Sequence, residues 1–311
     1  MEPILQIEHL SITFTQYSRG ARRRELPVIR DLSLSLSPGE VTAVVGASGS
    51  GKSLLAHAIL GLLPYNSRRE GSILYKGQEL TPRRLEKLRG REISLVPQGV
   101  TYLDPLMKVG PQLTQGRRDI DTRRRAQEAL SRYGLGPGTE RLYPFQLSGG
   151  MARRVLMASA VMESPQLIIA DEPTPGLDAQ AAGRLLGHFR ELAQEGAAVL
   201  FITHDLELAL TVAHRVAVFY AGETIEEALA SDFEAGSLRH PFTQALWDAL
   251  PQRGFRPIPG SQPYPGEVGE GCPFLGQCPH PGADCAQGPL PLRPFQGGAV
   301  RCLYPNKEVA P

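Results

Sequence analysis

The feature that most constrains this sequence is an eight-residue segment, residues 46–53, which reads GASGSGKS. It fits the pattern G-x-x-x-x-G-K-[ST], in which glycines let backbone N–H groups turn inward around an anion. The start of the following helix adds the positive end of its dipole. Lys52 is then expected to bind the β- and γ-phosphates of a nucleotide, and Ser53 to bind Mg²⁺. The residues of this phosphate loop expected at the nucleotide are Gly46, Ser48, Gly49, Ser50, Gly51, Lys52 and Ser53.

The neighbouring sequence has the pattern that such a loop requires. Residues 41–45 form a short apolar run rich in β-branched side chains, which predicts a strand. Residues 53–63 carry apolar side chains at helical spacing. The other interpretation is a flexible Gly/Ser loop, and the strand–loop–helix context favours the phosphate site.

Two adjacent carboxylates follow a second apolar run, at residues 167–170. Asp171 is placed to hold Mg²⁺ through water, and Glu172 to polarise the attacking water as general base. Two acids that end a buried strand are costly unless a cation lies nearby. The alternative is a strand that simply leaves the core into a charged turn.

Composition excludes several classes of protein. The 311 residues include 33 Lys and Arg against 32 Asp and Glu, a net charge of +1, whereas a dedicated nucleic-acid binder usually has a basic excess. Apolar runs such as residues 197–202 are far shorter than the roughly 20 residues of a membrane span. The N-terminus has no basic-then-apolar signal layout. We therefore expect a soluble, cytoplasmic globular chain of one large domain or two ordinary ones.

Strand and helix patterns alternate along the first 250 residues, which predicts an α/β fold. Ile93–Val96 and Ala198–Thr203 read as further strands. Their continuous apolar character is typical of a parallel sheet covered on both faces. Residues 81–150 are more helical and strongly basic, and we interpret their arginines as a solvated helix face.

Four further short motifs follow one another in order along the chain. They are Gln98, the segment 147–151 (LSGGM), the segment 175–178 (PGLD) and the segment 203–205 (THD). The second of them opens a predicted helix at residues 152–162, and so presents another anion-binding N-terminus. Together with the phosphate loop and the two carboxylates, these motifs resemble the ATP-binding-cassette (ABC) family over residues 5–230.

The resemblance implies a P-loop NTPase (RecA-like) cassette in an ATPase domain at residues 1–235, with a helical subdomain at roughly 90–160. Residues 236–311 would form a small Cys/Pro-rich C-terminal extension. The resemblance also implies a head-to-tail dimer that binds ATP and Mg²⁺. In that dimer Ser148, Gly149 and Gly150 of one subunit contact ATP held by the other.

The same resemblance implies roles for the remaining motif residues. His204 would contact the γ-phosphate and orient the attacking water. Gln98 would bind Mg²⁺ and water and link the core to the helical subdomain, and Asp178 belongs to the loop beside the nucleotide. An aromatic ring near the N-terminus would stack on adenine. Spacing favours Phe14, with Tyr17 as the alternative, and Phe14 fits plain core packing equally well.

A narrower resemblance, to the peptide/nickel importer branch of the family, lies in residues 239–246 (RHPFTQAL) and 98–105 (QGVTYLDP). The segment 147–151 resembles the signature motif of the family and has Met151 where that motif has glutamine. This difference casts no doubt on hydrolysis, because Lys52, Asp171, Glu172 and His204 are all present.

This branch implies an ATPase subunit that powers the uptake of dipeptides or oligopeptides, or alternatively of nickel or a metal chelate. The implied partners are a second ATP-binding subunit, usually a paralogue, two membrane-spanning permease subunits and, indirectly, an extracytoplasmic solute-binding protein. The chain would then lie at the cytoplasmic face of the membrane. A soluble ABC protein acting on DNA or ribosomes is the alternative from another class, but such proteins generally carry a second cassette. A third interpretation is a regulatory module that senses metal or redox state.

The last 61 residues differ in composition from the rest of the chain, because they hold 13 of the 27 prolines and all four cysteines. They cannot form long helices and have too little apolar periodicity for a core of their own. Clustered cysteines in a cytoplasmic protein indicate metal ligation. The four candidate ligands, separated by five, six and sixteen residues, are Cys272, Cys278, Cys285 and Cys302. This wide spacing and the branch resemblance favour a [4Fe–4S] cluster over zinc, and unligated thiols are the remaining alternative.

Overall fold

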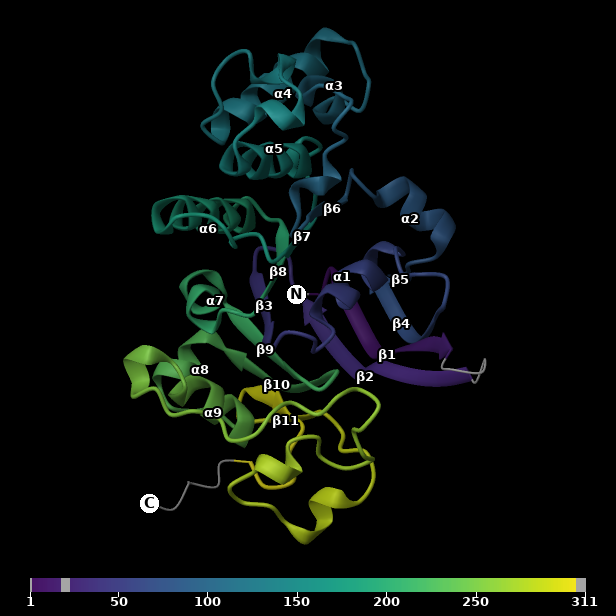
Figure 1. Ribbon diagram of the computed structural model, residues 1–311, viewed down its shortest axis with the longest axis vertical. Coiled ribbons are helices and arrows are strands. Elements are labelled where there is room, and N and C mark those ends of the chain that lie inside the picture. Colours follow the sequence, from purple (N-terminus) through teal and green to yellow (C-terminus); the bar gives the residue numbers. More distant parts are fainter. Residues whose placement is uncertain (1, 18–22, 306–311) are drawn as a thin grey trace.

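The computed structural model describes residues 2–17 and 23–305, and its largest element is an eight-stranded sheet (Figure 1). The strand order is β11-β12-β10-β9-β3-β8-β7-β6, and the five strands from β9 to β6 run parallel. These five are β3 (Val41–Gly46), β6 (Ile93–Val96), β7 (Leu167–Asp171), β8 (Ala198–Thr203) and β9 (Arg215–Tyr220). Every residue of β3, β7 and β8 is buried, which confirms the predicted parallel sheet with both faces covered.

Helices cover the two faces of this sheet. Because side chains alternate along a strand, Val44 packs with α1 (Lys52–Leu60) on one face, while Val45 packs with α6 (Ala179–Gln194) and α7 (Leu206–Val212) on the other. Helix α1 ends earlier than the predicted residue 63. Gly61 stops it in the left-handed conformation, with φ of 64°, which glycine adopts at little cost.

A second, smaller sheet covers α1 from its outer side. Its order is β2-β1-β4-β5, all antiparallel. The strands are β1 (Leu5–Tyr17), β2 (Arg23–Leu36), β4 (Ser67–Tyr75) and β5 (Gln78–Glu79), and α2 (Pro82–Leu88) follows them. Their inward side chains share one hydrophobic cluster with α1 and the main sheet. Helix α1, which follows the phosphate loop, is therefore held between two sheets.

A group of helices projects from one end of the molecule, beyond β6 and α6 (Figure 1). It consists of α3 (Val109–Leu113), α4 (Ile120–Arg132) and α5 (Gly149–Val161). Thr122, Ala126 and Leu130 are buried at four-residue spacing along α4, and Arg123 and Arg124 between them are exposed. The predicted solvated arginine face is confirmed for these two residues.

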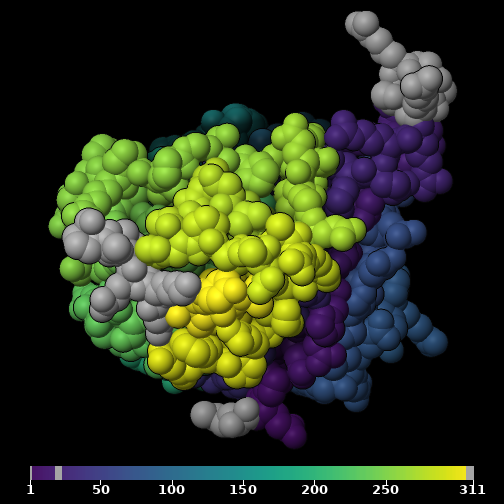
Figure 2. Space-filling view, turned by 90° about the horizontal axis from the view of Figure 1, so that it is seen from below, coloured from purple at the N-terminus to yellow at the C-terminus, as the bar shows by residue number. Residues whose placement is uncertain are grey.

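The C-terminal segment lies at the opposite end and extends the main sheet. Strand β12 (Gly298–Val300) pairs with β10 (Glu223–Leu229), and β11 (Arg293–Phe295) pairs with β12. Figure 2 shows this yellow segment lying against the green surface of α8 (Ala230–Glu234) and α9 (Pro241–Asp248). The sequence did not indicate what holds this segment in a fixed conformation. The structure shows that β11 and β12 do so in part, because they join the main sheet.

Two buried arginines anchor the C-terminal segment to the rest of the chain. Arg301, 2% exposed, binds Asp31 Oδ2 at 2.9 Å and donates to the carbonyl of Thr224 at 3.0 Å. Arg239, 3% exposed, contacts Glu226 at 3.3 Å and donates to the carbonyl of Phe295 at 2.9 Å. Buried charges are stable only when paired and hydrogen-bonded, so these contacts fix the segment in place.

Across the two described ranges, 2–17 and 23–305, no helix is both long enough and apolar enough to span a bilayer.

Candidate nucleotide-binding site

The phosphate loop connects the C-terminal end of β3 to the start of α1. Two of its glycines are required by local geometry. A Cβ on Gly46 would come within 2.4 Å of the carbonyl oxygen of Phe219, and Gly51, the N-cap of α1, has a φ of 96°. The loop therefore takes a backbone path that other residues would disturb, and it presents the amides that open α1.

Lys52 lies inside this loop and is 6% exposed. Its Nζ donates to the carbonyls of Gly46 at 2.8 Å and Ala47 at 2.9 Å. Burial lowers the pKa of Lys52, and the nearby Glu172 and Asp171 carboxylates oppose that effect. The described residues give it no ion pair within 4 Å, so its charge is available to an anion in the loop.

The end of β7 brings a carboxylate to the loop. Ser53 Oγ donates to Asp171 Oδ1 at 3.1 Å. Asp171 is 6% exposed, and its burial raises its pKa while the Ser53 bond lowers it. This contact follows from the fold, because β3 and β7 flank β8 in parallel and their C-terminal ends lie at one edge. A hydroxyl and a carboxylate side by side are suitable ligands for Mg²⁺.

Glu172 and His204 form a pair next to Asp171. His204 Nδ1 lies 2.7 Å and 2.9 Å from the two carboxylate oxygens of Glu172. The Glu172 side chain is 10% exposed and that of His204 is 55% exposed. Glu172 has a φ of 46°, an unusual conformation for a non-glycine residue, and such backbone strain clusters at functional sites. The arrangement gives a shielded base that an exposed imidazole orients.

Gln98 lies at the same edge of the sheet. It comes two residues after β6, and β6 runs parallel to β7 with Val96 opposite Ala170. Gln98 is exposed, so its side chain is accessible to a ligand bound at this edge of the sheet.

The segment that contains Ser148 lies elsewhere in the molecule. Ser148 is the N-cap of α5, and its Oγ accepts from the amide of Met151 at 3.2 Å. The helix therefore starts at Gly149, earlier than the predicted residue 152. Ser148 and Gly149 are exposed, and Gly150 is partly so. In Figure 1, α5 and α1 are well separated, so one chain does not bring both helix starts to the same nucleotide.

Asp178 and the N-terminal aromatic residues have simpler surroundings. Asp178 is exposed and caps α6, with Oδ1 accepting from the amide of Ala181 at 2.8 Å. Phe14 is partly buried against the cluster formed by the smaller sheet and α1. Tyr17 is 74% exposed. The choice of adenine-stacking residue stays a prediction.

The four cysteines all line one small cavity of about 10 Å³ in the C-terminal segment, together with His240 and His280. The amide of Cys272 donates to the carbonyl of Cys285 at 2.8 Å. Burial raises the pKa of the Cys272 thiol to about 12, and the other three cysteines add to the shift. Within the part of the chain that the structure describes, no three His, Cys, Asp or Glu side chains are arranged to hold a metal ion. The fold brings the four candidate cysteines to one cavity, but their arrangement is not that of a metal site and does not support the predicted metal centre.

One residue that sequence reasoning did not single out connects the helical group to this site. Arg153, in the first turns of α5, donates to the carbonyl of Pro173 at 3.3 Å, directly after Glu172. The sequence does place Arg153 on the same predicted helix as the residues that follow Gly150. It does not indicate that the side chain of Arg153 binds the carbonyl of Pro173.

The sheet order, the phosphate loop and the carboxylates at the strand ends define a P-loop nucleotide-binding protein with a helical subdomain. The match to known proteins narrows this class. Residues 29–175 match the family described as ABC transporter, and residues 225–285 match the oligopeptide/dipeptide transporter C-terminal region. This chain therefore belongs to the ABC transporter family and, within it, to the group of oligopeptide and dipeptide transport ATP-binding proteins.

Curated relatives resemble the chain over nearly its whole length. It is 34% identical to the oligopeptide transport ATP-binding protein OppD of Escherichia coli K12, covering 99% of this chain and 95% of that one. It is 35% identical to the dipeptide transport ATP-binding protein DppD of Bacillus subtilis, covering 90% and 88%. Among solved structures, the dimeric structure of a bacterial ABC transporter cassette matches with a TM-score of 0.63 at 27% identity, covering 73% of this chain and 98% of that one. A post-hydrolysis dimer of the same cassette, bound to ADP and phosphate, matches equally well.

Proposed function

We propose that this chain is the ATP-hydrolysing subunit of an importer for oligopeptides or dipeptides. The observation that carries the proposal is the grouping of Lys52, Ser53, Asp171, Glu172 and His204 at one edge of the sheet. The names of the relatives, which match almost the full chain, support the peptide cargo. Uptake of nickel or a metal chelate, which the sequence left open, has no support among the relatives described above.

Each residue at this edge has a task in the proposed reaction. Lys52 and the loop amides, those of Gly46, Ser48, Gly49, Ser50 and Gly51 among them, bind the β- and γ-phosphates. Ser53, Asp171 and Gln98 hold Mg²⁺ directly or through water. Glu172 takes a proton from the attacking water, and His204 orients Glu172 and contacts the γ-phosphate. Phe14 or Tyr17 stacks on adenine.

The separation of α5 from α1 supports a head-to-tail dimer. The N-terminus of α5 ends in exposed groups, Ser148 Oγ and the amides of Gly149 and Gly150, that can donate to a phosphate. Because these groups do not reach Lys52 of the same chain, we propose that they complete the site of a partner subunit, with Asp178 in the loop beside that nucleotide. The dimeric cassette structures similar to this chain are consistent with that assembly. We propose that the partner is a paralogous ATP-binding subunit.

Exposed apolar side chains next to Gln98 support docking to membrane-spanning permease subunits. Tyr102, Leu106 and Met107 are 57%, 88% and 42% exposed, close together in the chain. Clustered exposed apolar residues mark protein–protein contacts. The subunit would therefore work at the cytoplasmic face of the membrane, with an extracytoplasmic solute-binding protein delivering the peptide. Residues 1–235 would form the ATPase domain, with its helical subdomain at roughly 90–160, and residues 236–311 the extension.

The dimer proposal predicts that the chain alone hydrolyses ATP slowly and gains activity on assembly. A monomer lacks half of the phosphate donors, and donors of this kind change turnover by on the order of a hundredfold. Turnover is measured for the monomeric chain and for the assembled transporter at equal site concentration. A monomer verified by light scattering that matches the complex would contradict the head-to-tail site.

The cysteine cavity carries a finer proposal, that Cys272, Cys278, Cys285 and Cys302 bind a [4Fe–4S] cluster or a zinc ion. The support is their convergence on one cavity with four thiols and two imidazoles. A volume of about 10 Å³ holds one water-sized body, which is closer to the size of a zinc ion than to that of a cluster, and either metal centre would require the cysteines to rearrange. Metal binding would add to the anchoring by Arg301.

We expect the protein purified without oxygen to contain metal, and a Cys278→Ser variant to lose it. A brown protein with iron and sulfide indicates the cluster, and a colourless protein with one zinc per chain indicates the zinc site. Elemental analysis of both proteins, with a Ser261→Ala variant as control, makes the distinction. A wild-type protein free of iron and zinc would rule out both.

A further inference from the structure

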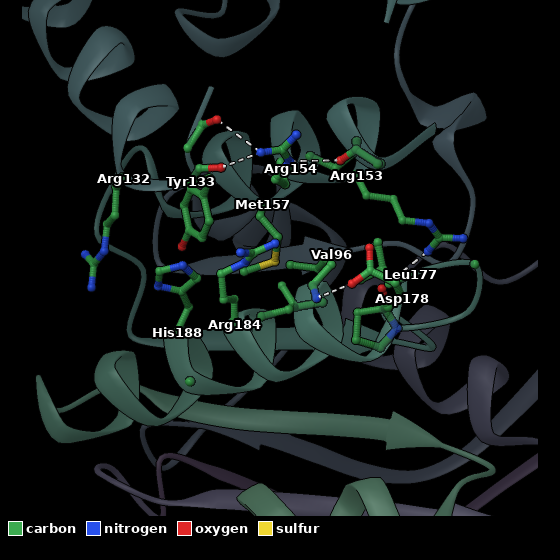
Figure 3. Close-up of a pocket in the computed structure, with 18 of the residues that line it drawn as sticks. Val96, Arg132, Tyr133, Arg153, Arg154, Met157, Leu177, Asp178, Arg184 and His188 are labelled. Carbon is green, nitrogen blue, oxygen red and sulfur yellow. Dashed lines mark hydrogen bonds between the residues drawn. The ribbon is translucent and has the colours of Figure 1, made fainter. Parts of the chain in front are cut away.

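A cavity of about 850 Å³ separates the helical subdomain from the main sheet domain. In Figure 3 its upper wall comes from α5 and the end of α4, and its lower wall from α6. One end is formed by residues 173–178, the segment that follows Glu172. No residue of the phosphate loop lines the cavity, and its volume is within the range of small-molecule sites.

Positive charge in this cavity is only partly compensated. Arg153, Arg154 and Arg184 line it, and the described residues provide none of them with a carboxylate within 4 Å. Arg154 donates instead to the carbonyl of Gly134 at 3.0 Å. Neutral carbonyls satisfy hydrogen bonds but do not neutralise a guanidinium, so an anion in the cavity would be attracted.

The two acids of the cavity are already engaged. Glu191 lies 3.4 Å from Arg132 and 3.1 Å from His188. Asp178 caps α6 through the amide of Ala181. In Figure 3, Arg184 reaches from α6 toward Met157 of α5, on the opposite wall, with Tyr133 and His188 beside it. The guanidinium of Arg184 therefore lies in the space between the walls.

A buried hydroxyl provides a second, independent observation. Tyr133 is 4% exposed and lines the cavity, and its hydroxyl has no hydrogen-bond partner. Its ring packs edge-on against His188, with 4.7 Å between ring centroids, so the hydroxyl is held in place. Buried hydroxyls are nearly always bonded, so this one, on a residue that lines the cavity and without a protein partner, is expected to bond to a water or to a bound ligand there.

We infer that this cavity binds a small phosphorylated anion, at a site separate from the phosphate loop. Phosphate oxygens would accept from Arg184, in the bidentate geometry that guanidinium groups favour, from the remaining terminal nitrogen of Arg154, and from the Tyr133 hydroxyl. A ligand so placed contacts both α5 and α6 and therefore holds the helical subdomain against the sheet domain. This inference does not depend on the proposed transport role.

The test is a calorimetric titration of the full chain with inorganic tripolyphosphate, carried out in a Lys52→Ala background and repeated in the wild type. Citrate is titrated in parallel as a probe that carries carboxylates. We expect saturable binding of tripolyphosphate that Arg184→Gln weakens at least tenfold. Arg190→Gln, an exposed arginine on the same helix outside the cavity, is the matched control and should leave it unchanged.

Tyr133→Phe separates a ligand-binding role from a structural one. Removing a buried hydroxyl that has no partner should leave the melting temperature unchanged or higher, while the affinity for tripolyphosphate falls several-fold. Absence of saturable binding, equal affinities of the Arg184→Gln and Arg190→Gln variants, or an unchanged affinity of Tyr133→Phe would overturn the inference. Tighter binding of citrate would overturn its assignment to phosphate. ATP binding at the phosphate loop is measured in a separate titration, and its result does not affect the inference about the cavity.

Discussion

Lys52→Ala is expected to abolish tight ATP binding. The ammonium is 6% exposed, bonds only to the carbonyls of Gly46 and Ala47, and has no direct ion pair within the described residues. In the complex with ATP, the ammonium would pair with the phosphates. Removing one member of such a buried charge pair costs about 3 kcal/mol, which corresponds to more than about a hundredfold in Kd. The affinity is measured by equilibrium titration with ATP and Mg²⁺.

Lys87→Ala is the matched control, because Lys87 is exposed in the last turn of α2. It should bind ATP as the wild type does. An affinity of the Lys52→Ala variant within twofold of the wild type would show that the phosphates are bound elsewhere.

Glu172→Gln is expected to separate binding from turnover. Glutamine keeps the size of the side chain and can still bond to His204, so the site should keep its shape and its affinity for ATP. It cannot accept the proton of the attacking water, and general bases contribute about 10²- to 10⁴-fold to rates. We therefore expect hydrolysis by the assembled transporter to fall at least a hundredfold, measured as phosphate release.

The control for this experiment is Glu234→Gln, at an exposed position in α8. Because the second subunit of a heterodimer could still hydrolyse ATP, the comparison uses a partner whose own catalytic glutamate has been replaced. Near wild-type phosphate release under these conditions would exclude Glu172 as the base.

The parallel sheet could be predicted because its strands are buried on both faces. Ile93–Val96 and Ala198–Thr203 lie where the apolar runs placed them. The order of the strands then brings Ser53 to Asp171, as the motifs indicated. Helix ends were less predictable, since the start of α5 depends on Ser148 acting as its cap.

Contacts between distant residues could not be read from the sequence. Strands β11 and β12 have three residues each, too few for a periodic pattern. Nothing local marks Arg301 as the partner of Asp31, which lies 270 positions earlier. The bonding of His204 to Glu172 likewise depends on how two loops at the strand ends face each other. These features are set by tertiary packing, where single-sequence patterns carry little information.

The attachment of the C-terminal segment has a consequence for how the protein is made. Strand β12 and Arg301 leave the ribosome after the other described strands. Strand β12 nevertheless covers the edge of β10, and Arg301 pairs with the buried Glu223 and the partly exposed Asp31. A nascent chain that has completed every nucleotide-binding motif therefore still has an open sheet edge at β10, and its Glu223 has Arg30, 3.6 Å away, but not yet Arg301. Exposed edges of this kind favour aggregation. Synthesis of residues 298–301, rather than completion of the phosphate loop, would then decide when this edge of a newly made subunit is protected from aggregation.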